Sequence, residues 1–113
     1  MNNYNHLLIV KYHFEKNYKD IISWEKNLKK ILKKFQKEGT ETSFAIINKN
    51  KSISYNIHIY SQNEGDILKR HGELEILCGY PCSFEYKRAN GKADSSKFNY
   101  PNWERVIYWE KQK

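Results

Sequence analysis

The stretch Ser43-Phe-Ala-Ile-Ile-Asn-Lys-Asn-Lys-Ser-Ile-Ser-Tyr-Asn-Ile-His-Ile-Tyr-Ser61 decides the fold, because it reads as two strands joined by a short turn. Residues 43–48 and 52–61 are rich in β-branched and aromatic side chains, and residues 49–51 supply the turn. In the second strand apolar residues alternate with polar and aromatic ones, so one side is apolar and the other carries Asn56, His58 and Tyr60. The hairpin therefore presents one side to a core and the other to water or to a site.

The segments on either side of this hairpin complete an α+β pattern. We predict a strand over residues 6–14, a helix over 17–38, a helix over 63–78, a strand over 83–88, a polar loop over 89–100 with a turn at Asn90-Gly91, and a short helix over 101–111. The order β-α-β-β-α-β predicts a ferredoxin-like fold, with an antiparallel sheet, helices on one face and a short C-terminal helix. No repeat or linker divides the chain, so we predict a single domain over residues 1–113.

The helices over residues 17–38 and 101–111 are predicted from the spacing of their apolar residues. One apolar stripe runs along residues 17–38 and consists of Ile21, Trp24, Leu28, Ile31, Leu32 and Phe35. Lysines fill much of the remaining surface, which is more often a solvated face than a phosphate-binding one, and Gly39 ends the helix. In residues 101–111, Trp103, Val106, Ile107 and Glu110 follow the spacing i, i+3, i+4, i+7, which predicts a helix docked on the core.

Charge and composition narrow the kind of partner. The chain has 20 Lys and Arg against 13 Asp and Glu, a net charge of +7, which favours a polyanion such as nucleic acid or an acidic membrane surface. No apolar run approaches the roughly 18 residues of a membrane span, and the first residues do not resemble a secretory signal. We therefore expect an intracellular protein, in the cytoplasm or in a host cell if the chain is viral.

The two cysteines do not form a disulfide framework. Cys78 and Cys82 have CxxxC spacing with His71 upstream, but a zinc site normally needs four ligands. Two buried or half-buried thiols at a turn are the favoured interpretation.

Two groups of residues suggest a functional site. Asn56 and His58 share one face of their strand, and Asn48 ends the neighbouring strand, so we expect the three to converge across the hairpin. In the predicted C-terminal helix, Tyr108 and Lys111 are neighbours at i, i+3, which places a phenol beside an ammonium group. If that helix lies over the open sheet face, Tyr108 arrives next to the other three.

This arrangement resembles the HUH endonucleases, which include the rolling-circle replication initiators (Rep proteins) of small viruses and plasmids. Tyr55-Asn56-Ile57-His58-Ile59 resembles the family's metal-binding His-hydrophobic-His strand, and Tyr108-Trp109-Glu110-Lys111 resembles its Tyr-x-x-Lys motif. Asn56 replaces the first histidine, so the ligands Asn48, Asn56 and His58 bring no negative charge to a metal.

The resemblance implies single-strand DNA nicking and joining. It implies Mg²⁺ or Mn²⁺ as the cofactor, Tyr108 as the nucleophile that forms a 5′-phosphotyrosine link, and Lys111 as its helper. Single-stranded DNA is then the partner, a homodimer is possible, and the nucleic-acid contacts fall to Tyr60, Trp109, Lys87 and Arg88.

Two other functions remain open at this point. One is a non-catalytic module that binds single-stranded nucleic acid, with bases stacked on Tyr12, Phe14, Tyr55 or Tyr60. The other is a small basic regulator, viral or plasmid-borne, that binds a protein. Metal-dependent cleavage, salt-sensitive binding without cleavage, and no nucleic-acid binding at low salt distinguish the three functions.

Overall fold

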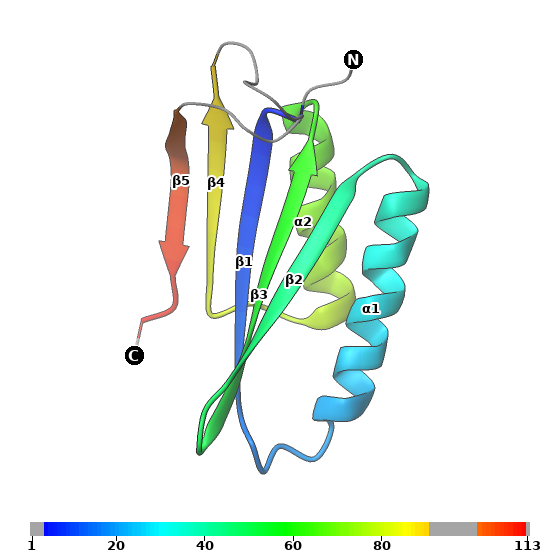
Figure 1. Cartoon of the computed structure of the whole chain (residues 1–113), viewed down its shortest axis with the longest axis vertical. Helices are drawn as coiled ribbons and strands as arrows, with labels where there is room; N and C mark the ends of the chain where they lie inside the picture. The colour runs from blue at the N-terminus through cyan, green and yellow to red at the C-terminus, as the bar shows by residue number, and fades with distance from the viewer. Residues whose placement is uncertain (1–3, 91–101, 113) are drawn as a thin grey trace.

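A five-stranded antiparallel sheet is the frame of the molecule in the computed structural model, which describes residues 4–90 and 102–112 (Figure 1). The elements, in chain order, are β1 (His6–Glu15), α1 (Ile21–Lys37), β2 (Glu41–Asn48), β3 (Ser52–Ser61), α2 (Glu64–Cys78), β4 (Ser83–Ala89) and β5 (Trp103–Glu110). The order across the sheet is β2-β3-β1-β4-β5, and every neighbouring pair is antiparallel. The predicted ferredoxin-like α+β arrangement is confirmed, because its first four strands occupy the order β2-β3-β1-β4.

Both helices pack on one face of this sheet (Figure 1). Side chains on β1 and β3 alternate between the two faces, and register fixes which ones meet: Leu8 lies opposite Ile59, and Val10 opposite Ile57. These four side chains are at most 1% exposed and form the centre of the core. From the helices, the core takes Leu28, Ile31, Leu32 and Phe35 of α1 and Ile67, Leu74 and Cys78 of α2. The apolar stripe predicted for α1 is therefore confirmed.

The helix ends follow from local sequence. The side chain of Asn63 accepts a hydrogen bond from the backbone N–H of Asp66 (2.7 Å) and so caps α2. Gly39 and Gly79 follow α1 and α2 with φ of 95° and 87°, values that a side chain disfavours. The predicted hairpin is also present, since the backbone N–H of Lys49 donates to the carbonyl of Ser52 (2.9 Å).

A buried arginine joins the two helices. Arg70 of α2 is 3% exposed, and its guanidinium group donates to Glu38 (2.5 Å) and to Thr40 Oγ1 (3.2 Å). It also pairs with Asp66 (3.1 Å) and lies over the ring of Phe35, 4.8 Å from the centroid. A buried charge with this many partners holds the end of α1 against α2.

The predicted C-terminal helix is wrong, because residues 103–110 form strand β5 on the outer edge of β4. Val106, Ile107, Tyr108 and Trp109 are β-branched or aromatic and favour a strand as much as their spacing favours a helix. Pairing with β4 decides between them, since it satisfies backbone groups along β4 that would otherwise form an open edge.

The remaining predictions on the fold concern the loop after β4 and the membrane. Residues 91–100 of the predicted polar loop, and Gly91 of its turn, lie outside the described residues. Among the helices that the structure describes, none has the length and apolar character that crossing a bilayer requires.

Candidate nucleic-acid interface on the open face of the sheet

The face of the sheet opposite the helices carries the candidate site. The alternation that buries Leu8, Val10 and Ile57 turns their neighbours to this open face. The open-face side chains include Leu7, Ile9, Lys11 and His13 of β1, Glu41, Ser43, Ala45 and Ile47 of β2, Ser54, Asn56, His58 and Tyr60 of β3, Ser83, Glu85 and Lys87 of β4, and Trp103, Arg105, Tyr108 and Glu110 of β5. They combine cationic, aromatic and amide groups, which is the chemistry that contacts phosphates and bases.

One row across four strands forms the centre of this face. His58 on β3 lies opposite Ile9 on β1, Ile9 lies opposite Glu85 on β4, and Glu85 lies opposite Tyr108 on β5. Strand spacings of about 4.8 Å put the backbones of His58 and Tyr108 about 14 Å apart. All four residues line a depression of about 480 Å³, and Asn56 lines it too. Tyr108, Asn56 and His58 therefore border one depression, but Tyr108 reaches it from strand β5 and not from the predicted helix.

An irregularity in β5 puts a cation beside Tyr108. Ile107 pairs with Tyr86, whereas Arg105 pairs with Lys87, so Val106 is an extra residue between them. The bulge turns Arg105 and Tyr108, which are three positions apart, to the same face. The guanidinium carbon of Arg105 lies 4.5 Å from the centroid of the Tyr108 ring, which is a cation–π arrangement.

The charges at the centre are partly balanced. Glu85 binds the guanidinium group of Arg105 and lies 3.5 Å from Lys87 Nζ. Burial lowers the pKa of His58 from its ordinary value, and the charge of Lys87 lowers it further. His58 is therefore a neutral imidazole at neutral pH, able to donate one hydrogen bond and to accept another.

Two aromatic rings lie over one end of the open face. Tyr60 on β3 and Trp103 on β5 meet edge to face, with ring centroids 6.2 Å apart. Their strands are separated by β1 and β4, so the rings must reach toward each other across these two strands. Leu7, on β1 between them, is only 6% exposed although α1 and α2 both lie on the other face.

Tyr108 itself is an exposed phenol with an acidic neighbour. Its hydroxyl donates to Glu110 (3.0 Å), and this hydrogen bond raises the pKa of the phenol above its ordinary value. A higher pKa means less phenolate at neutral pH, which works against a nucleophilic role. Lys111 follows β5 and lines, with Tyr108, a second depression of about 500 Å³. The two residues thus border one site, but not as neighbours on a helix.

The predicted metal ligands do not come together as expected. Asn48 lies opposite Ile53 on β3, which places it on the other face of the sheet from Asn56 and His58. Asn56 lies opposite Ala45 on β2, so Ala45 shares its face. Asn48 lies three positions after Ala45, and this odd spacing turns it to the other face. Convergence of the three across the hairpin is therefore wrong.

The donors that remain do not fit a Mg²⁺ or Mn²⁺ site. Asn56 Oδ1 is buried and accepts no hydrogen bond from the described part of the chain, so this oxygen is one unsatisfied acceptor. His58 is neutral, and Glu85, the carboxylate that lines the same depression, is already held by two cations. Hard divalent cations prefer several oxygen donors with negative charge. Within residues 4–90 and 102–112, no three His, Cys, Asp or Glu side chains are grouped to hold a metal. The metal stays a prediction.

Several residues predicted to contact nucleic acid lie on the other face. Trp109 pairs with Phe84 and stacks on its ring, with centroids 5.7 Å apart, on the side of the helices. Arg88 lies opposite His6 and so also points away from the open face, whereas its neighbour Lys87 lies on it. The face on which Trp109 and Arg88 lie could not be predicted without the register of β4 and β5.

The residues expected to stack on bases in the alternative module are core residues. Tyr12 and Tyr55 are 3% and 1% exposed, and the Tyr12 hydroxyl donates to the carbonyl of Gly79 (2.7 Å). Phe14 packs edge-on against Trp24 of α1. Stacking on these three is therefore wrong, and Tyr60 alone among the predicted platform residues lies on the open face.

Other residues of the open face were not predicted as site residues. Glu85 and Arg105 lie at its centre and Trp103 at its end, and Lys11 borders both depressions. The alternation in residues 6–14 already separates Lys11 from the apolar residues beside it, so that signal was present in the sequence. The roles of Arg105 and Trp103 depend on β5, which was predicted as a helix.

Comparison with known proteins adds no assignment: no family model matches the chain, and searches of curated proteins and of solved structures found no match. The class is therefore defined by fold and surface alone. It is a ferredoxin-like α+β domain whose sheet has one face covered by helices and one open, cationic and aromatic face.

Proposed function

We propose that this protein binds single-stranded nucleic acid across the open face of its sheet. The observation that carries the proposal is the position of Lys11 and Arg105 on the lining of the central depression, with Lys87 opposite Arg105 on the same face and Tyr60 and Trp103 at one end. Cationic side chains attract the phosphates, and exposed ring faces stack on bases of any sequence. A duplex presents few free base faces to such a surface, so a single strand is the better ligand.

The centre of the face suits contact with a base. Asn56 Oδ1 has no partner among the described residues, and the neutral imidazole of His58 lies in the same depression. An amide oxygen accepts from an exocyclic amine, and a neutral imidazole offers one donor and one acceptor. These groups provide hydrogen bonds to a base that the strand places in the depression.

The lysines of α1 contribute at a distance. Lys26, Lys30, Lys33 and Lys37 are exposed on the helix layer, on the other side of the sheet from the open face. Their charge raises the association rate of a polyanion at low salt without contacting the bound strand. Binding should therefore weaken steeply as salt increases.

The test uses two adjacent cations on β4 that lie on opposite faces. Fluorescence anisotropy of labelled 20-nucleotide oligo-dT and oligo-U at about 50 mM salt measures affinity for the wild type, Lys87→Ala and Arg88→Ala. We expect Lys87→Ala to weaken binding about tenfold and Arg88→Ala to have less than a threefold effect. No binding at low salt, or equal losses in both variants, would overturn the proposal.

DNA nicking is a second candidate, and one observation favours it: Tyr108 lies in the same cross-strand row as His58 and borders the same depression. The test is to incubate the protein with pooled single-stranded oligonucleotides and Mn²⁺, followed by intact mass analysis. A covalent adduct that disappears in Tyr108→Phe would establish the activity. Binding without an adduct, together with no Mn²⁺ binding by calorimetry, would leave the binding function alone.

A further inference from the structure

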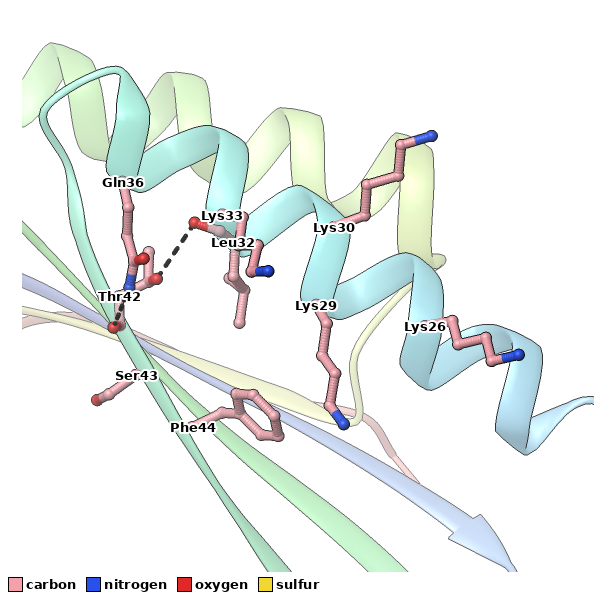
Figure 2. Close-up of a pocket in the computed structure, with 9 residues that line it drawn as sticks. All are labelled: Lys26, Lys29, Lys30, Leu32, Lys33, Gln36, Thr42, Ser43 and Phe44. Carbon is pink, nitrogen blue, oxygen red and sulfur yellow. Dashed lines mark hydrogen bonds between the residues drawn. The ribbon is translucent and has the colours of Figure 1, made fainter.

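The two outer edges of the sheet differ in what lies beside them. Along β2, Gln36 Nε2 donates to the carbonyl of Thr42 (3.0 Å), and Thr42 Oγ1 donates to the carbonyl of Leu32 (3.3 Å), so α1 is attached to this strand (Figure 2). The groove between them has a volume of about 730 Å³, and its lining includes Lys26, Lys29, Lys30 and Lys33. A second copy approaching this edge would bring the same four ammonium groups, so like charges oppose pairing of two copies here.

Along the β5 edge, the described part of the chain places neither a helix nor a row of lysines. Val106, Ile107, Tyr108 and Trp109 are 42%, 46%, 47% and 41% exposed, although they are consecutive apolar or aromatic residues of a strand. Among the described residues, no strand pairs with the outer side of β5. An exposed strand edge with these side chains is a template for a further strand.

The charges on β5 are complementary to those of a second copy. Glu104 and Arg105 lie at the start of the strand, and Glu110 and Lys111 at its end. In an antiparallel pair the start of one strand meets the end of the other, so Arg105 comes close to Glu110 and Glu104 close to Lys111, twice by symmetry. Ile107 and Trp109, on the helix side, then meet the same residues of the other copy and lose contact with water.

We propose that β5 pairs with β5 of a second copy and forms a two-fold symmetric dimer with one continuous sheet. A two-fold axis normal to the sheet keeps each face on its own side, so both open faces lie on the same side of the dimer. The interface closes on itself, and the lysine-lined β2 edges form the two ends. A strand from an unrelated protein on β5 is the competing occupant, and the test below distinguishes it.

The test compares two isoleucines in matching positions. Ile107 on β5 and Ile46 on β2 are 46% and 44% exposed, and both lie on the helix side of an outer strand. Sedimentation equilibrium is run from about 1 to 300 µM, a range that covers the affinity of a small interface. We expect the mass of the wild type to rise from 13.6 kDa toward twice that value. Ile107→Lys should stay monomeric, and Ile46→Lys should dimerise like the wild type.

Two further measurements make the result decisive. Far-UV circular dichroism and urea unfolding confirm that both variants fold, which is expected since each side chain is nearly half exposed. Amide hydrogen exchange should show β5 becoming protected as the concentration rises, while β2 does not change. A wild type that stays monomeric, as expected if β5 receives another protein, would overturn the proposal. So would a dimer that survives Ile107→Lys or is lost in Ile46→Lys.

Discussion

The two faces of the sheet are built from the same strands and differ in almost every physical respect. On β3, Ile57 and Ile59 are completely buried against the helices, whereas Asn56 and His58, which alternate with them along the strand, line an open depression. On the covered face, the apolar side chains pack against one another and against the helices, so they are not accessible to a ligand. The open face carries cations, aromatic rings and an Asn56 oxygen that has no hydrogen-bond partner among the described residues, which are groups that a binding surface uses. Under the proposed function, stability and recognition are thus assigned to alternate residues of one strand.

The largest effect should come from the covered face. Ile57→Ala removes a side chain that is 0% exposed and should lower the free energy of unfolding by about 2–5 kcal/mol. The open-face control is Ile47→Ala on β2, where the side chain is 46% exposed and the expected loss is below about 1 kcal/mol. Urea denaturation measures both. Equal losses would show that the open face also contributes a core.

Removing an open-face ring should change affinity and leave stability nearly intact. Tyr60→Leu keeps the apolar contact with Trp103 but loses the ring face, so affinity for a single-stranded oligonucleotide should fall about tenfold. Tyr18→Leu is the control, since this ring is 44% exposed but stacks on Phe14 on the helix side. Anisotropy titrations measure both variants. A similar loss for Tyr18→Leu would mean that the strand does not follow the open face.

Lowering the pH should reduce the stability of the folded state through His58 and His6. Burial lowers the folded-state pKa of His58 and of His6, so the unfolded chain takes up these protons first as the pH falls. Protonation then favours unfolding, and stability should decline as the pH falls below about 6.5, the ordinary histidine value.

His58→Gln should flatten part of this decline and leave the part that comes from His6. Urea midpoints between about pH 5 and pH 8 measure the change. The Asp66 carboxylate does not interfere, because burial opposes ionisation but hydrogen bonds from Thr40 and Ser61 hold its pKa below the ordinary 3.8. An unchanged pH profile in His58→Gln would show that His58 is not desolvated.

The smallest effect is expected at the phenol that first suggested catalysis. Tyr108→Phe removes a hydroxyl that bonds only to the exposed Glu110 among the described residues, and it keeps the ring under Arg105. Binding should change less than about twofold, and the urea midpoint should stay that of the wild type. Titration and urea unfolding of the same sample measure both. A tenfold loss of binding would give the hydroxyl a direct role in holding the strand.

The fold could be predicted where sequence periodicity admits one solution. The alternation in residues 52–61 and the stripe of α1 each fit a single kind of element, and both are present. Residues 103–110 admit two solutions, because Trp103, Val106 and Ile107 fit a helix while four consecutive apolar residues fit a strand. The free edge of β4 decides between them, and that edge exists only after the sheet is assembled.

The candidate site was partly predictable for the same reason. Asn56 and His58 share a face by alternation within one strand, which the sequence shows directly. The position of Glu85 between His58 and Tyr108 depends on the register of three strand pairs. The extra residue Val106 moreover reverses the alternation within β5. Neither register nor bulge is encoded in local spacing, so the sequence did not show that Arg88 and Trp109, predicted to contact nucleic acid, lie on the helix side of the sheet.

The central position of β1 has a consequence for the timing of synthesis. Leu8 pairs with Ile59 on one side and with Tyr86 on the other, so the middle strand is made first and its partners much later. At about 5–20 residues per second, a ribosome needs about 3–10 seconds to extend the chain from Leu8 to Ile59. During this interval the apolar run Leu7–Val10 has no strand to pair with. The nascent chain is therefore most prone to chaperone capture or aggregation before β3 emerges, and far less so once the hairpin is complete.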